Sequence, residues 1–571
     1  MLLLPGEWRT ENASSRDRLR PARKDMTDSR KKLFLLNDEQ IREYIANGYI
    51  KVETSLPGEL HEAIARKLDL MVERGPNLGN NVLPHAPEFR HVLNAPEVQG
   101  ALISLLGEDY IEYPHRFCHA SLPEDKVPED IPSEVGQRYH QDSYTPMARP
   151  RQHYPRFARI IYYPRDTPVA LGPTHVSPGT QFHQAIAEED RAAATPMVGA
   201  AGSLWITHFD IAHGAGVNQS DVVRHMIKFI YMQRTESTSP AWNCGDERWQ
   251  NPDNLQAPWD LEVAWSHIWD WMCGNPDRYY SFKSNHGSTA DGNVADLVAA
   301  LTPSETLDRV LVAIRKLAAL GPRAAEAVPA LAALLNQDHQ AARTAATYAL
   351  GAIGDPAVEI LEKRLEEAGQ SGWDKDTSTG WTESAVSMMD EAHALSAGGA
   401  SAVAPLAALL AAPDEWSRIN AAFALGEMGS AARDAVPALT RCLDDDSHRV
   451  VRSALDALGL IGRRADQFVP RMGRFLVESR PDWEEVLTGS RAWMARDQVR
   501  INAATALARL GPNAAATEQE LIKSLDDPCG YVGMIATDAL QHVGSATAAK
   551  AVMDLVLAQR WDSSLTKARL W

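Results

Sequence analysis

Residues 203–229, SLWITHFDIAHGAGVNQSDVVRHMIKF, place two apolar segments on either side of a glycine-rich turn. The segments Ser203–Thr207 and Val222–Tyr231 are rich in the β-branched and aromatic residues that are typical of strands. A further segment of this kind, Phe157–Tyr163, precedes them, and Gly and Pro residues separate all three. The pattern predicts a β-sandwich or barrel. Helical patterns over Asp38–Gly48 and Gly58–Arg74 are expected to flank it.

This stretch holds two histidines, and they differ in what stands eleven residues later. His213 is followed by Arg224, whereas His208 is followed by Gln219, which cannot neutralise a carboxylate. The glycine-rich turn would let the chain fold back, so that Arg224 points toward the same cavity as His213. An always-charged planar guanidinium there suits a bidentate grip on a carboxylate co-substrate.

A second motif lies upstream, in the sequence RYHQD at 138–142. On a strand, His140 and Asp142 would share one face, because alternate side chains point the same way. Two histidines and one carboxylate on one face of an iron(II) ion leave three coordination positions open. That is the arrangement of oxygen-activating non-haem iron sites.

With these motifs in this order, residues from about 35 to 290 resemble the phytanoyl-CoA dioxygenase family of iron(II)- and 2-oxoglutarate-dependent oxygenases. The stretch LGPTHVSPGTQ at 171–181 also resembles a segment of that family. The resemblance implies a double-stranded β-helix, or jelly roll. It also implies that His140, Asp142 and His213 bind iron and that Arg224 binds the distal carboxylate of 2-oxoglutarate. Family members commonly carry Ser or Thr two residues after the distal histidine, whereas this chain has Ala215.

The reaction that the resemblance implies uses iron(II), 2-oxoglutarate and dioxygen, and releases succinate and carbon dioxide. The expected outcome is hydroxylation of an unactivated C–H bond in a small-molecule metabolite. Asp142 leaves no vacant ligand position for a halide, which disfavours halogenation, while desaturation and ring closure stay open. Weaker candidates for contacts to substrate or co-substrate are His119, Thr174 and His175.

The C-terminal half is internally repeated. Glycines that end similar apolar segments recur at positions 321, 354, 429, 462, 511 and 544, so that three of the five separations are 33 residues. The longer gaps indicate insertions or a degenerate unit. The polar segment Gly369–Glu383 is predicted to be a loop. Ala-rich helix pairs of this length resemble HEAT-like repeats, which stack into an all-α solenoid over about 302–560.

The predicted organisation is therefore a multidomain α+β protein. A basic, disordered leader (1–33) precedes the oxygenase domain (34–290), which ends in a Trp-rich helical extension (236–290), and the solenoid follows. The Trp cluster is expected to pack this extension against the sheet rather than to line a pocket. Among 571 residues, 75 acidic side chains against 57 basic ones give a net charge of −18, which disfavours a nucleic-acid partner.

The five scattered cysteines include no CxxC pair and favour a reducing, cytoplasmic location. No uninterrupted apolar run reaches the roughly 20 residues of a membrane-spanning helix. The solenoid leaves a protein or carrier-bound substrate open as an alternative, because its curved surface suits partners; it could equally cap the active site or mediate self-association. A non-catalytic interaction protein is a further alternative, and a lyase or bilin-related protein with similar repeats a more remote one.

Overall fold

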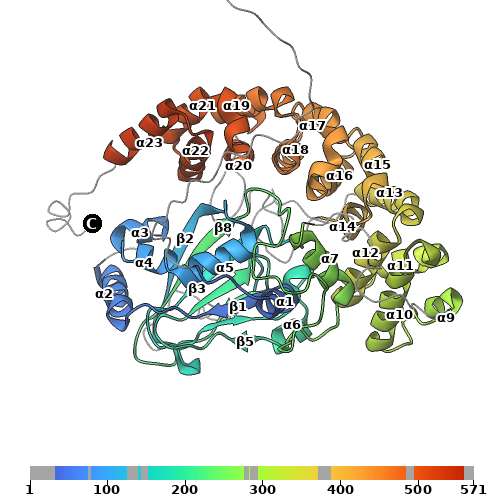
Figure 1. Cartoon of the computed structure of the whole chain (residues 1–571), viewed down its shortest axis with the longest axis horizontal. Helices are drawn as coiled ribbons and strands as arrows, with labels where there is room; N and C mark the ends of the chain where they lie inside the picture. Colours follow the sequence, from blue (N-terminus) through green and yellow to red (C-terminus); the bar gives the residue numbers. More distant parts are fainter. Residues whose placement is uncertain are drawn as a thin grey trace, which may run out of the picture.

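A computed structural model describes residues 33–74, 79–124, 139–142, 152–274, 282, 293–370, 388–483 and 494–558. Residues 1–32, which make up nearly all of the expected leader, lie outside this set. The described chain has a β-rich N-terminal part and a helical C-terminal part, and the helical part curves around the β-rich part as an arc (Figure 1).

The larger sheet has five antiparallel strands in the order β1-β6-β3-β8-β2. Its central strand, β3 (Phe157–Tyr162), is buried at every position, as is its neighbour β8 (Arg224–Met232), because both faces of the sheet are covered. The predicted strands at 157–163, 203–207 and 222–231 correspond to β3, β6 and β8. The other strands are β1 (Tyr49–Val52), β2 (Ile111–Ser121) and β6 (Leu204–His208).

The smaller sheet has three antiparallel strands in the order β5-β4-β7. They are β4 (Thr174–Val176), β5 (Thr195–Pro196) and β7 (His213–Ala215). Thr174 lies directly opposite Ala215, and Val176 lies opposite His213. The smaller sheet therefore presents the second histidine motif, while the larger sheet presents Arg224.

Helices cover the outer face of the larger sheet. The predicted helix at 38–48 is α1 (Asp38–Asn47), which Asn37 caps with its side chain and Gly48 ends in a left-handed conformation. The helix predicted at 58–74 is α2 (Gly58–Arg74). Shorter helices are α3 (Val82–His85), α4 (Phe89–Leu93), α5 (Pro96–Leu106) and α6 (Glu188–Ala192).

The Trp-rich segment is used for packing, as expected. Helix α7 (Glu262–Met272) carries Trp265 and Trp269, both fully buried. Their rings contact those of Trp242 and Trp249. The helix lies between the β-rich part and the first helices of the arc (Figure 1).

The arc consists of stacked helix pairs. Each inner helix contacts the next one along the arc. The inner helices are α10 (Leu307–Leu320), α12 (Gln340–Ile353), α14 (Asp390–Ala397), α16 (Glu415–Glu427), α18 (His448–Ile461), α20 (Ala495–Leu510) and α22 (Gly530–Val543). The outer helices are α11 (Val328–Leu334), α13 (Asp355–Gln370), α15 (Val403–Leu409), α17 (Val436–Cys442), α19 (Val469–Val477), α21 (Glu518–Lys523) and α23 (Ala546–Ala558), and α9 (Val294–Ala299) precedes the first pair.

The repeat glycines have a backbone reason to recur. All six lie at the end of an inner helix with a positive φ, between 54° and 73°. Side chains with a Cβ rarely adopt this conformation, so glycine ends each inner helix and lets the chain turn into the outer one.

The irregular repeat spacing also has a structural explanation. The long gap between Gly354 and Gly429 holds an additional helix pair, α14 and α15, whose inner helix is followed by Gly398 and Gly399. Of the predicted loop, Gly369 and Gln370 are the last residues of α13, and 371–383 lies outside the described residues. The degenerate unit that the spacing allowed is thus an extra repeat.

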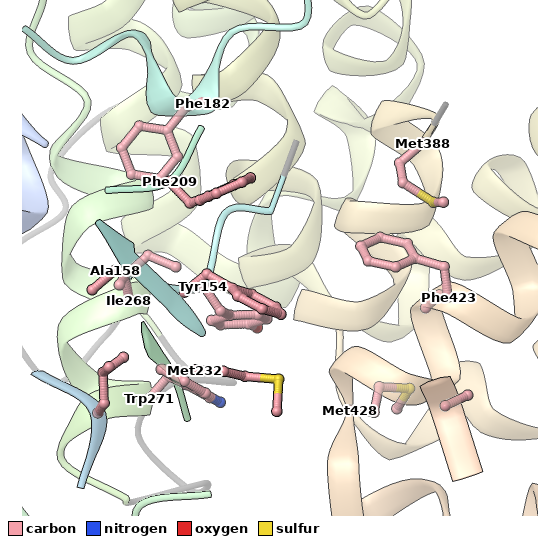
Figure 2. Close-up of a cluster of buried hydrophobic side chains, with 14 of the residues drawn as sticks. Tyr154, Ala158, Phe182, Phe209, Met232, Ile268, Trp271, Met388, Phe423 and Met428 are labelled. Atoms are coloured by element: carbon pink, nitrogen blue, oxygen red, sulfur yellow. The ribbon is translucent and has the colours of Figure 1, made fainter. Parts of the chain in front are cut away.

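The inner face of the arc is in contact with the β-rich part, and one buried apolar cluster runs through both. Figure 2 shows Tyr154, Met232 and Trp271 of the β-rich part opposite Phe423 and Met428 of the repeats. The helical arc therefore shares its core with the domain that it surrounds.

One helical stretch, Leu307–Leu334, has the length and apolar composition of a membrane-crossing segment. Just over half of it, 56%, is buried inside the protein. It comprises α10 and α11 with a 3₁₀ segment between them, in which Ala324 is not helical. Buried, interrupted helices of this kind are ordinary parts of a helical core.

Candidate functional site

The structure brings His140, Asp142 and His213 together. One ligand atom from each lies within 4.8 Å of the others. Asp142 Oδ1 is 3.6 Å from His140 Nε2, and Asp142 Oδ2 is 3.8 Å from His213 Nε2. Donors about 2.1 Å from one shared ion lie no more than about 4.2 Å apart, so these separations suit a common cation.

Backbone pairing places the two histidines side by side. His140 N–H donates to His213 O at 2.9 Å, and His213 N–H donates to His140 O at 3.0 Å. This reciprocal pair brings the two imidazole rings to 4.4 Å between centroids. The expectation that the His-x-Asp motif lies on a strand was wrong in this respect, because among residues 139–142 only His140 pairs, as an isolated bridge. His208, the rejected alternative, is not a member of the cluster.

The donor set fits a metal ion. His213 Nδ1 lies 3.0 Å from Ile211 O, so a proton on Nδ1 bonds the carbonyl and leaves the Nε2 lone pair facing the cluster. Asp142 is 0% exposed, and neither of its carboxylate oxygens accepts a hydrogen bond from a described residue. A buried carboxylate in this state is costly without a cation.

Two buried cations that sequence reasoning missed lie beside Asp142. Arg159 Nη1 is 3.1 Å from Asp142 Oδ2, and Lys228 Nζ is 3.7 Å from the same oxygen. Arg159 Nη1 also donates to His213 Nε2 at 2.7 Å. A metal ion on His213 Nε2 would need the same lone pair, so this N–H must give up its acceptor when a metal binds. A signal was present, since each cation interrupts an otherwise apolar strand, in FARIIYY and MIKFIYM.

These charges set the protonation states of the cluster. Burial raises the pKa of Asp142, but Lys228 and Arg159 outweigh burial and hold it well below its usual value. Burial, reinforced by Arg159, holds the pKa of His213 well below its usual value. At neutral pH, Asp142 is therefore ionised and His213 is neutral, which are the states that metal coordination requires.

Arg224 begins β8 and is 1% exposed. Its guanidinium donates to Ser121 Oγ at 2.6 Å and to the carbonyl of Gly172. Arg224 and Lys228 lie four residues apart on one strand, so both point to the same face. The predicted Arg224 therefore lies on the side of the sheet that carries Lys228, next to the cluster.

The weaker candidates lie close to Arg224. His119 pairs with Met226 across β2 and β8, between the positions of Arg224 and Lys228. Burial, followed by these two cations, holds the pKa of His119 well below its usual value. Thr174 donates its backbone N–H to Tyr163 Oη at 2.8 Å, while its buried hydroxyl has no hydrogen-bond partner among the described residues. His175 is half-buried, with Nδ1 3.1 Å from Pro173 O.

Comparison with known proteins agrees with this organisation. Residues 48–226 match the family model described as phytanoyl-CoA dioxygenase (PhyH), and residues 294–371 and 393–485 match HEAT repeats. A search of curated proteins found no match.

Three of the solved structures with a similar fold illustrate the range of distant likeness. A "non-heme monooxygenase, ThoJ-Ni complex" is 20% identical over 37% of this chain and 85% of that chain, with a TM-score of 0.28. The "non-heme alpha ketoglutarate dependent epimerase SnoN" is 17% identical over 34% and 82%, with a TM-score of 0.27. EvdO2 from Micromonospora carbonacea var. aurantiaca, complexed with 2-oxoglutarate, is 17% identical over 35% and 92%, with a TM-score of 0.26. Likeness this distant carries no conclusion about substrate or reaction. On the family models, the chain combines a phytanoyl-CoA dioxygenase domain with C-terminal HEAT repeats.

Proposed function

We propose that this protein is an iron(II)- and 2-oxoglutarate-dependent oxygenase that hydroxylates an unactivated C–H bond of a small-molecule metabolite. The observation that carries the proposal is the buried cluster of His140, Asp142 and His213, two neutral-type donors and one ionised carboxylate. Three protein donors on one side of an ion leave positions for co-substrate and dioxygen. Bound iron(II), with 2-oxoglutarate and dioxygen, would supply the oxidising power, and 2-oxoglutarate would become succinate and carbon dioxide.

The residues of the chain have distinct tasks in this proposal. His140, Asp142 and His213 hold the metal. The hydrogen bond between His213 Nδ1 and Ile211 O keeps Nε2 directed to the metal and keeps the ring in one orientation. Arg159 and Lys228 keep Asp142 ionised in a site from which protein atoms exclude bulk water.

Arg224 is assigned to the distal carboxylate of 2-oxoglutarate. Its present acceptors, Ser121 Oγ and Gly172 O, are neutral, so a carboxylate would be a stronger partner for the guanidinium. Thr174 faces Ala215 directly across β4 and β7, and its unpartnered hydroxyl is suited to add a second contact there. The hydroxyl that Ala215 lacks would then come from the neighbouring strand.

We also propose that the two antiparallel sheets belong to a jelly roll and that residues 34–290 form the oxygenase domain and 302–560 the solenoid, in a cytoplasmic protein. The inner face of the repeats is occupied by the oxygenase domain, which favours a scaffold role over recruitment of a protein substrate at that face. Recruitment by the outer helices is the alternative for a protein or carrier-bound substrate.

Succinate formation from 2-oxoglutarate tests the proposal. Purified full-length protein with iron(II) is mixed with lysate split by ultrafiltration into a low-molecular-weight filtrate and a retained fraction. Iron-dependent succinate formation stimulated by the filtrate is expected. Stimulation by the retained fraction alone would favour a macromolecular substrate.

The control variants are Asp142→Ala, which removes a ligand, and Asp446→Ala, whose carboxylate is fully exposed in the repeats. Asp142→Ala should abolish iron-dependent succinate formation, and Asp446→Ala should leave it unchanged. Full activity of Asp142→Ala would overturn the proposed function. Failure of the wild-type protein to bind iron(II) and 2-oxoglutarate would instead support a non-catalytic interaction protein.

A further inference from the structure

Three buried cations point into the interior of the β-rich domain beside the metal cluster. Arg224 and Lys228 lie on the same face of β8, and Arg159 lies on the adjacent strand β3. Ile161, two residues after Arg159, pairs with Lys228, so Arg159 and Lys228 are diagonal neighbours on one face. The sheet register therefore makes these two side chains a pair.

The pair converges on one atom. Arg159 and Lys228 both lie within ion-pair distance of Asp142 Oδ2, at 3.1 and 3.7 Å, and they are 1% and 5% exposed. A metal ion held by Asp142 would draw on the same carboxylate charge. Both cations would then share a carboxylate that is already neutralised, and a buried cation is costly unless a counter-charge accompanies it.

The charges of the described residues near this site do not balance. The cations are Arg159, Lys228 and Arg224, and the carboxylates are Asp142 and Asp210. Asp210 acts together with Arg159 on the pKa of Tyr44, and its Oδ2 accepts the backbone N–H of Gln152. A divalent metal adds two positive charges, and 2-oxoglutarate brings two negative ones. The site therefore keeps a positive surplus after metal and co-substrate are counted, within a protein of net charge −18.

We propose that Arg159 and Lys228 form an anion-binding site that takes a carboxylate or phosphate group of the substrate. This inference rests on the proposed function and names its substrate class: small anionic metabolites. Arg159 supplies a planar fork, with Nη2 already donating to Phe209 O at 2.5 Å, and Lys228 supplies a compact charge. The substrate is oriented by its charged group, next to Asp142, so that a neighbouring carbon faces the metal.

The test is anion binding to the full-length protein loaded with cobalt(II) and 2-oxoglutarate without oxygen. Cobalt(II) reports on its surroundings through its visible absorption spectrum. Inorganic phosphate is titrated in one arm and acetate in the other, with calorimetry as a second readout. One additional anion is expected to bind, and the arm with the tighter binding identifies the group. Lys228→Met and Arg159→Met should each weaken this binding at least tenfold and change 2-oxoglutarate affinity less than threefold.

Two variants serve as controls. Lys228→Arg keeps the charge and should retain binding within about threefold of wild type. Lys363→Met removes an exposed lysine of α13 and should change nothing. Thermal unfolding of each variant shows whether it is folded, and Lys228→Arg still tests the site if Lys228→Met is not.

Two results would overturn the inference. One is that the wild-type protein binds neither anion. The other is that Lys228→Met and Arg159→Met reduce 2-oxoglutarate affinity as much as anion affinity, which would assign both cations to the co-substrate. Failure of the proposed function looks different, because then cobalt(II) or 2-oxoglutarate does not bind the wild-type protein. Phosphate and acetate titrations of the metal-free protein still test the anion site in that case.

Discussion

Buried arginines are treated differently in the two halves of this molecule. In the repeats, the arginines that precede the repeat glycines by eleven residues each meet an aspartate. Arg343 contacts Asp390, Arg418 contacts Asp445, and Arg500 contacts Asp527. In the β-rich domain, Arg159 and Lys228 share one carboxylate and Arg224 contacts neutral oxygens.

The difference separates structural charge from functional charge. A matched pair satisfies both partners inside the folded chain, so nothing further needs to bind. A group of cations with too few carboxylates is stabilised by an anion from outside. The border between the two halves follows the structural rule, since buried Arg156 of the β-rich domain lies between Glu236 and Glu427 of α16, at 3.4 and 3.5 Å.

The largest effect is expected from the unmatched side, in Asp142→Ala. Loss of this ligand should weaken metal binding by about 100-fold or more, because two histidines remain without their carboxylate. Equilibrium dialysis with cobalt(II) measures the change. An unchanged metal affinity would mean that the cluster is not the metal site.

On the matched side, Glu427→Gln should destabilise the protein by about 3 kcal/mol, because it leaves buried Arg156 with only part of its counter-charge. Asp554→Asn removes one partner of the exposed pair Lys550–Asp554 and should cost less than about 1 kcal/mol. Urea unfolding compares the two variants. Equal costs would show that the border between the halves does not depend on matched charge.

Two glycines at equivalent repeat positions isolate the role of that border. Gly429→Ala should cost about 2–3 kcal/mol, since φ is +54° and the added Cβ would meet the Glu236 carboxylate. Gly462→Ala, with φ of +62° and open space around it, should cost only about 1 kcal/mol. Thermal unfolding distinguishes them. A larger cost at Gly462 would contradict the docked position of the repeats.

Acid should destabilise both halves through histidines that are buried and neutral. Burial, followed by Arg159, lowers the pKa of His208 to about 3, and burial, followed by Arg452 and Arg449, lowers that of His448 to about 3. Each group stabilises the folded state above its unfolded pKa of about 6.5, and this contribution is lost as pH falls toward 3. Between pH 7 and 5, each should account for about 1–2 kcal/mol. His208→Gln and His448→Gln should each show a shallower loss of stability in urea unfolding at the two pH values, whereas slopes like wild type would contradict the assignment.

Much of the site could be predicted from sequence because it depends on residue type and short spacing. His213 was separated from His208 by the identity of a single residue, Arg224 rather than Gln219, and the structure places His213 in the cluster. The strands at 157–163 and 222–231 and the helix at 58–74 were predicted within a few residues, since their apolar patterns are local.

The rest depended on contacts between distant segments. The pairing of His140 with His213 as an isolated bridge, rather than as part of a strand, follows from how the two sheets meet. The role of Arg159 and Lys228 required the register of β3 against β8, which no spacing along the chain reveals. The extra repeat at α14 was hidden because its glycines stand in an altered sequence context.

The amino-acid sequence by itself determined which residues have the chemistry to hold a metal and a carboxylate, and that 33-residue units stack into a solenoid. Those properties belong to side-chain types and to backbone periods of a few residues up to one repeat. Only the tertiary structure decided that the solenoid encloses the oxygenase domain and that two further cations face Asp142. Sheet order, register and docking arise from burial shared between segments hundreds of residues apart, so they exist only once the chain has folded.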